Sequence, residues 1–268
     1  MSVYYCIPSK RPPEEAEKCL KLWRAAGYKI ALWRDSVDDA NSELDWVMNN
    51  HMTAYWDTYP GYSVAVNTLA LRILRDDPQC DWIVTGGDDV EPDANHSAEE
   101  IARQCSEHFL TEAWANSKEA DGGDSRVLIQ APHILVDSAL TTFGVMQPTG
   151  DRFAGGSIDR ICGSPWLGRS WCERINQGRG PLWPDYTHCF GDEELQNVAL
   201  KYGVLWQRPD LIHLHRHYQR ESDALNSNAV PKPMPDFLKE ANSPEHWRKY
   251  QTLFRERKAA GFPGSEPL

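Results

Sequence analysis

The opening of the chain constrains the fold most, because its first residues alternate between strand and helix patterns. Residues 3–8 form a short apolar run, and residues 12–27 carry apolar side chains at helical spacing. A second strand is predicted over 29–34 and ends at Asp35. In such a unit the loops that follow the two strands face the same edge of a sheet, where ligands bind. The chain is therefore expected to be an α/β protein.

The rest of the chain continues this pattern up to a polar C-terminal tail. We expect helices over 61–78, 97–114 and 244–259 and from 192 onward, and strands over 81–85, 127–136 and from 204 onward. Residues 36–60 are expected to form a short helix and a loop, and residues 149–184 an irregular functional surface. No internal repeat and no separate second domain is expected.

Composition limits the class of protein further. The 268 residues are 41% hydrophobic, which suits one large domain. No stretch approaches the roughly 18 apolar residues of a membrane helix, and the first residues lack the pattern of a secretory signal. We therefore expect a cytoplasmic protein with no membrane partner. The seven cysteines include no C-x-x-C pair, so reduced, buried thiols are expected rather than disulfides or a zinc knuckle.

Net charge bears on possible partners. The formal net charge is −11, which argues against a protein that holds a nucleic-acid backbone by bulk electrostatics. A local basic groove remains compatible with that charge. Oligomeric state does not follow from the sequence.

The strongest chemical signal is the pair Asp88 and Asp89. The two carboxylates follow an apolar strand and Gly86-Gly87, which places them beyond the carboxyl end of that strand. Paired carboxylates can hold Mg²⁺ or Mn²⁺, and these ions can bridge to a diphosphate. The alternative is an ordinary Asp-rich turn.

Three histidines at alternate positions form a second candidate. His213, His215 and His217 would share one face of an extended chain. One of them could complete a metal site with the aspartate pair, and His215 is favoured. The alternative is that these histidines are hydrogen-bonded structural groups.

Acidic residues at the start of a predicted helix form a third candidate. Asp192, Glu193 or Glu194 could take a proton from an acceptor hydroxyl as a general base. Capping and the helix dipole would explain the same residues without any catalytic role.

The fourth candidate is a stretch rich in arginine and tryptophan. Guanidinium groups and indole faces suit the recognition of phosphates, sugars and bases. Solvated arginines with tryptophans folded inward are the alternative. We list as candidate acceptor-binding residues Trp166, Arg169, Trp171 and Arg174.

The order of these features resembles a GT-A-fold nucleotide-sugar glycosyltransferase over most of residues 1–218. The matching segments are YYCIPS, ALWRD, the helix from Gly61, WIVTGGDDVEPD as a DxD-type segment, FGDEEL and HLHRH. The segment GGDDV departs from literal D-x-D spacing. The resemblance implies a single Rossmann-like GT-A domain over 1–220, with a mixed, mostly parallel sheet flanked by helices. A nucleotide-sugar half would cover about 1–95 and an acceptor half about 96–220. Residues 221–268 would be an extension with one helix.

The resemblance also implies site residues and ligands. The first two strand ends would hold the nucleoside of the donor. The donor-binding residues implied are Pro8, Ser9, Arg11, Asp35, Asp88 and Asp89. A divalent Mn²⁺ or Mg²⁺ would be held by Asp88, Asp89 and His215, and the donor would be a nucleoside-diphosphate sugar, UDP-sugar favoured. An inverting transfer would need a base among Asp192, Glu193 and Glu194, whereas a retaining one would not.

The compact, tryptophan-rich chain also resembles bacteriophage-encoded glycosyltransferases, which would place it in the host cytoplasm. Some of these modify hydroxymethylated bases in DNA, so modified DNA is a candidate acceptor. Two other functions stay open: a nucleotidyltransferase that makes a nucleotide sugar, and a non-catalytic module that binds carbohydrate or nucleic acid. Against the nucleotidyltransferase, SKRPPEE after the first strand contains no glycine for a phosphate loop.

Overall fold

The computed structural model describes residues 1–35, 40–120, 142–153 and 155–268. The strands are β1 (Ser2–Pro8), β2 (Lys29–Arg34), β3 (Thr53–Trp56), β4 (Cys80–Val84), β5 (Val90–Glu91), β6 (Val145–Pro148), β7 (Trp166–Gly168), β8 (Leu205–Arg208) and β9 (Leu214–His215). The helices are α1 (Pro13–Ala25), α2 (Ala40–Asn49), α3 (Tyr62–Asp76), α4 (Ala98–Ala120), the 3₁₀ helix η1 (Gly155–Asp159), α7 (Arg169–Gly178), α8 (Gly191–Lys201), α9 (Asp236–Lys239) and α10 (Pro244–Ala259).

Seven of the strands form one mixed sheet in the order β3-β2-β1-β4-β7-β6-β8. Strand β7 is antiparallel to both of its neighbours, and the other pairs are parallel. Strands β5 and β9 form a separate antiparallel pair. The expected α/β class with a mixed, mostly parallel sheet flanked by helices is confirmed.

The central strand β1 shows how the sheet separates two apolar cores. Val3, Tyr5 and Ile7 enter the core that contains α1 and α4 side chains. Tyr4 and Cys6 point to the opposite core, which contains side chains of α3, α7, α8 and α10. Alternate residues of a strand face opposite sides, so a strand that is apolar at every position is buried on both faces. The molecule therefore has a helix–sheet–helix arrangement.

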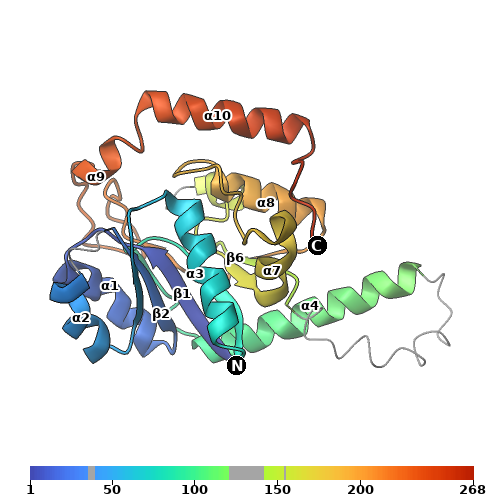
Figure 1. Cartoon of the computed structure of the whole chain (residues 1–268), viewed down its shortest axis with the longest axis horizontal. Helices are drawn as coiled ribbons and strands as arrows, with labels where there is room; N and C mark the ends of the chain where they lie inside the picture. Colours follow the sequence, from blue (N-terminus) through green and yellow to red (C-terminus); the bar gives the residue numbers. More distant parts are fainter. Residues whose placement is uncertain (36–39, 121–141, 154) are drawn as a thin grey trace.

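The C-terminal segment packs back onto the rest of the fold. Figure 1 shows α10 running across the top of the view, above α8, with the short α9 at its start. Tyr250 and Phe254 bury the inner face of α10 in the second core, and Ser243 caps its N-terminus by accepting a hydrogen bond from the backbone N–H of His246. The helix expected over 244–259 coincides with α10, and α9 is additional to the single helix expected in this segment.

Two regions differ from the sequence-based expectations. Strand β3 lies where only a helix and a loop are expected, and it pairs with β2 at the edge of the sheet. Within the supposedly irregular residues 149–184, the structure has η1, β7 and α7. Strand β7 has only three residues, too few to show a period of two. The strand expected over 127–136 lies outside the described residues.

Candidate functional site

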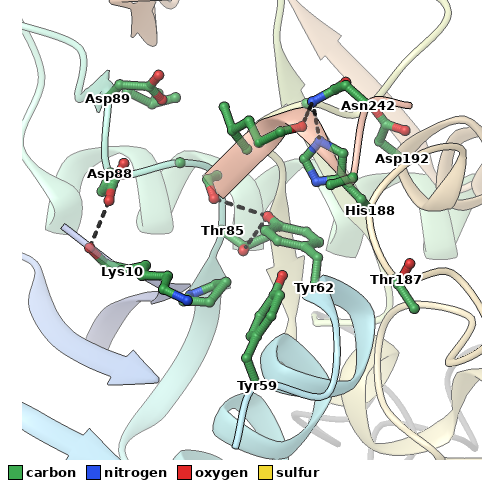
Figure 2. A pocket seen from close by; sticks show the side chains of 18 of the residues that line it. Lys10, Tyr59, Tyr62, Thr85, Asp88, Asp89, Thr187, His188, Asp192 and Asn242 are labelled. Carbon is green, nitrogen blue, oxygen red and sulfur yellow. Dashed lines mark hydrogen bonds between the residues drawn. The ribbon is translucent and has the colours of Figure 1, made fainter. Parts of the chain in front are cut away.

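A cavity of about 620 Å³ opens at the carboxyl ends of β1, β2 and β4. This is the edge at which parallel α/β sheets bind ligands. Nine of the candidate residues from the sequence line the cavity: Pro8, Ser9, Arg11, Asp35, Asp88, Asp89, Asp192, His215 and His217. Figure 2 shows Asp88 and Asp89 on one side of the cavity and Asp192 and His188 on the other.

The loop after β1 is held by a buried ion pair below it. Arg34 and Glu43 form two hydrogen bonds, and both side chains are almost completely buried. The same guanidinium donates to the backbone carbonyls of Ser9 and Arg11, at 2.5 and 2.9 Å. Because a buried guanidinium has few alternative partners, these contacts fix the course of the loop that carries Ser9 and Arg11 into the cavity.

The end of β2 supplies Asp35 to the same wall. Its carboxylate accepts hydrogen bonds from Lys10 Nζ and from the backbone N–H of Tyr59, both at 2.8 Å. Burial acts to raise the pKa of Asp35, but these two donors outweigh it and the pKa lies below its usual value. Asp35 is therefore an ionised acceptor in the cavity wall.

The glycine pair before Asp88 allows close packing of the strand end. A Cβ on Gly86 would lie 2.9 Å from Tyr5 Oη and 3.0 Å from Ser164 Oγ. The hydroxyl of Tyr5 donates to the carbonyl of Gly87 at 2.6 Å, and that of Tyr62 lies 3.1 Å from the carbonyl of Gly86. Two tyrosines from different elements thus hold the backbone that presents the two aspartates.

Asp88 is bound on both oxygens by residues of the neighbouring loop. Ser9 Oγ donates to its Oδ2 at 2.6 Å, and Arg11 Nε donates to its Oδ1 at 2.7 Å. The guanidinium of Arg11 also lies 3.7 Å from Asp89. A carboxylate whose oxygens already face a hydroxyl and a cation is better suited to fix a loop than to bind a metal ion directly.

Asp89 has the environment that a metal ligand would need. Its Oδ1 lies 3.4 Å from His215 Nε2, and the ring of His217 is 5.0 Å from that of His215. Burial acts to raise the pKa of Asp89, but His215 and Arg11 outweigh it and keep the pKa below its usual value. Carboxylate and imidazole together suit Mn²⁺. Even so, among the residues that the structure describes, no group of three or more His, Cys, Asp or Glu side chains is arranged to hold a metal ion.

The side chains of the three histidines do not all face the cavity. His215 and His217 line the cavity, whereas His213 is buried, with Nδ1 2.8 Å from Ser164 Oγ. Burial lowers the pKa of His213 to about 4. His213 is therefore a neutral structural group, which corrects its place among the candidate ligands.

Of the three acidic residues on α8, only Asp192 lines the cavity. Its Oδ1 accepts from the backbone N–H of Glu193, and burial raises its pKa. Glu194 is buried beneath α10, where Arg257 and Tyr186 bind its carboxylate. The candidate role of Glu194 as a base is therefore wrong, because the carboxylate is away from the cavity and already paired. Glu193 is not among the lining residues, although burial and the charge of Asp192 raise its pKa.

The predicted acceptor-binding residues lie elsewhere in the fold. Trp166 and Trp171 are fully buried, one in each core, so their indole faces have no free surface for stacking. Arg169 donates to the backbone carbonyls of Leu74, Asp77 and Cys80. Arg174 donates to the carbonyl of Leu268 at the C-terminus. None of these four residues lines the cavity, and burial leaves Trp166 and Trp171 no free face with which to stack on an acceptor.

The wall opposite Asp88 is not predicted by the sequence patterns. It comprises His188 and residues from α9 to the start of α10, and Tyr59 and Tyr62 lie between the two sides. The lining residues from the C-terminal segment are Asp236, Leu238, Glu240, Ala241, Asn242 and His246. They lie in a polar stretch with no strong periodicity, so the sequence carries no local signal that this stretch folds back to the cavity.

Comparisons with known proteins add the following findings. No protein-family model matches the sequence, and a search of curated proteins gives no match. Several solved structures share a similar backbone. One of them is S. aureus TarS 1-349 in complex with UDP, at 8% sequence identity and a TM-score of 0.45. The likeness covers 80% of this chain and 59% of that chain, so this chain spans less than two thirds of its neighbour. At this TM-score the likeness does not bear on function. No helix among the described residues is long and apolar enough to cross a membrane.

Proposed function

We propose that the protein is a glycosyltransferase that moves a sugar from a nucleoside-diphosphate sugar, with UDP as the favoured nucleotide, to an acceptor hydroxyl. The observation that carries this proposal is the cavity of about 620 Å³ that has Asp88 and Asp89 on one side and Asp192 on the other. The side with Asp88 and Asp89 suits a charged donor. The carboxylate of Asp192 suits an acceptor hydroxyl that must lose its proton.

The donor would lie along the ends of β1, β2 and β4. Tyr59 and Asp35 both line this part of the cavity, and an aromatic ring together with a carboxylate suits a nucleoside with its hydroxyl groups. Lys10 and Arg11 supply the positive charges of this wall, and the diphosphate would approach them. Both are already paired with aspartates, so their charge alone does not balance a diphosphate.

A divalent cation would complete this side of the cavity. Asp89 and His215 would hold it, with His217 nearby, and Asp88 would hold Arg11 and Ser9 in place. When bound, Mn²⁺ or Mg²⁺ would neutralise negative charge on the leaving diphosphate. This assignment moves Asp88 from the ligand set to a supporting position.

In the proposed transfer, the acceptor oxygen attacks the anomeric carbon while the bond from that carbon to the phosphate oxygen breaks. The bonding electron pair leaves with the nucleoside diphosphate, and the acceptor proton passes to the carboxylate of Asp192. Burial already raises the pKa of Asp192, which makes it a stronger base than an exposed aspartate. A base opposite the leaving group favours inversion at the anomeric carbon.

Modified DNA receives no support as the acceptor. Arg169 and Arg174, expected to bind it, are used for contacts within the chain, and Arg179 lies over the ring of Trp183. We instead place the acceptor between Asp192 and the C-terminal segment. A cytoplasmic location remains a prediction from the sequence.

Calorimetry with UDP, with and without Mn²⁺, tests the donor side. We expect binding that tightens when Mn²⁺ is present, and a binding module that needs no metal would show no such change. Incubation with UDP-sugars then tests the reaction. Release of UDP from a UDP-sugar supports sugar transfer. Release of pyrophosphate in an incubation with UTP and a sugar phosphate supports a nucleotidyltransferase. The absence of both products would contradict an enzymatic role.

A further inference from the structure

His188 lies on the acceptor side of the cavity, and the proposed donor site makes no use of it. His188 lies in the segment that leads into α8, four positions before Asp192. Figure 2 shows its ring on the same side of the cavity as Asp192 and beside Asn242, away from Asp88 and Asp89. His188 and Asp192 therefore face the same part of the cavity.

The contacts of Asn242 determine which nitrogen of His188 carries its proton. Asn242 Nδ2 donates to the carbonyl of Leu238 at 3.0 Å and lies 3.4 Å from His188 Nε2. Because the same amide nitrogen makes both contacts, the donor end of the amide faces the ring, and Nε2 must accept. Burial lowers the pKa of His188, so the ring is neutral. A neutral imidazole that accepts at Nε2 carries its hydrogen on Nδ1.

The amide that imposes this tautomer is itself fixed by the backbone. The N–H of Asn242 donates to the carbonyl of Leu238 at 2.9 Å. The next residue, Ser243, caps α10, and Phe254 anchors that helix in the core. The tautomer of His188 is therefore set by the C-terminal segment, which gives this segment a chemical role besides its place in the cavity wall.

The Nδ1–H group is available to a ligand. Within the described part of the chain, no hydrogen bond uses Nδ1 of His188. Asp192 presents an acceptor on the same side, with Oδ1 held by the backbone N–H of Glu193. A fixed donor and a carboxylate acceptor on one wall match two neighbouring hydroxyl groups, one that gives its proton to Asp192 and one whose oxygen accepts from His188.

We propose that His188 binds the acceptor by donating from Nδ1 to the oxygen next to the reacting hydroxyl, and that the acceptor is therefore a compound with neighbouring hydroxyl groups, such as a glycoside. This inference rests on the proposed glycosyltransferase function. It adds the chemical class of the acceptor and a residue that selects it.

The tautomer can be measured without any enzymatic activity. Long-range ¹H–¹⁵N spectra of the imidazole groups distinguish the Nδ1–H from the Nε2–H form, and the His188→Gln variant identifies the signals of His188. We expect the Nδ1–H form in the wild type and a mixture of both forms in Asn242→Ala. An Nε2–H form in the wild type would overturn the proposal, because the donor would then face Asn242.

Binding of methyl glycosides tests the acceptor class. With UDP and Mn²⁺ present, methyl glucosides, galactosides and mannosides are titrated into the full chain. We expect at least one to bind, and to bind about tenfold more weakly to His188→Ala, as the loss of one directed hydrogen bond implies. The affinity for UDP should stay the same in this variant. A folding defect would lower both affinities, so UDP binding is the internal control.

Monodeoxy glycosides identify the hydroxyl that His188 binds. Removal of that hydroxyl should weaken binding to the wild type by the same factor as His188→Ala, and should have little further effect in the variant. If UDP binds but no glycoside does, or if His188→Ala binds every glycoside like the wild type, this inference fails while the donor site stands. If UDP itself does not bind, the proposed function fails with it.

Discussion

At the scale of single residues, Asp88 and Asp89 are adjacent but have different partners. Asp88 contacts Ser9 and Arg11, whereas Asp89 faces His215. We expect Asp89→Asn to remove the tightening of UDP binding by Mn²⁺ and to leave metal-free binding little changed. Asp88→Asn should weaken UDP binding with and without Mn²⁺, because it releases the loop that carries Ser9 and Arg11. Calorimetric titrations of both variants test this, and an equal response to Mn²⁺ in wild type and Asp89→Asn would contradict it.

Asp192 should govern the acid limb of the pH–rate profile. Burial raises the pKa of its carboxyl, and only the ionised form accepts a proton. Turnover should therefore fall as the pH drops through this raised pKa, which lies above the usual value of about 3.9 for aspartate. Asp192→Asn should lower kcat by about 10²–10⁴. The measurement is the pH dependence of UDP release, and a wild-type acid limb that persists unchanged in Asp192→Asn would exclude this role.

The same substitution should have the opposite effect on stability. A carboxyl whose pKa is raised in the folded state holds its proton more tightly there, so folding is favoured below the unfolded pKa and this contribution is lost as the pH rises through the folded pKa. Asp192→Asn removes a buried charge at neutral pH and should increase the free energy of unfolding. A variant that is both less active and more stable distinguishes a functional carboxylate from a structural one.

At the scale of elements, one buried ion pair fastens α10 to α8. Arg257 donates to both carboxylate oxygens of Glu194 and lies over the ring of Trp183. Arg257→Met would leave the Glu194 charge buried without its cation, which costs about 3–5 kcal/mol of stability. The double change Arg257→Met with Glu194→Gln should cost less. Urea unfolding measures both, and the exposed Arg248→Met on the same helix, expected within about 0.5 kcal/mol of wild type, is the matched control.

The elements also show which parts of the fold the sequence could predict. Strands β1 and β2 and helix α3 were predictable because their buried faces are continuous and their ends carry turn residues. The topology alone predicts that the residues at the ends of β1, β2 and β4 lie at one edge of the sheet. These residues are Ser9, Asp35, Asp88 and Asp89. Strand β7 could not be predicted, since its three residues pair only with distant strands.

The other side of the site depends on long-range packing. Asn242 reaches His188 because α10 buries Tyr250 and Phe254 against the core, 50 or more residues along the chain from His188. No local pattern predicts such a contact. Conversely, Trp166 and Trp171 look like binding residues in sequence only because burial cannot be read from residue type.

At the scale of the whole molecule, the distribution of charge decides whether DNA can be the acceptor. The net charge is −11, and several arginines of the expected basic stretch pair with groups of the chain itself, as Arg169 does with Glu173 and Arg152 with Asp159. Binding to a phosphate backbone would require these contacts to break against the long-range repulsion of the acidic protein. We therefore expect no change in the fluorescence anisotropy of a labelled duplex, with or without hydroxymethylated bases, up to about 10 µM protein at low salt, where non-specific DNA-binding proteins already bind. Association that weakens linearly in log–log form with added salt would contradict this expectation and return modified DNA to the candidate acceptors.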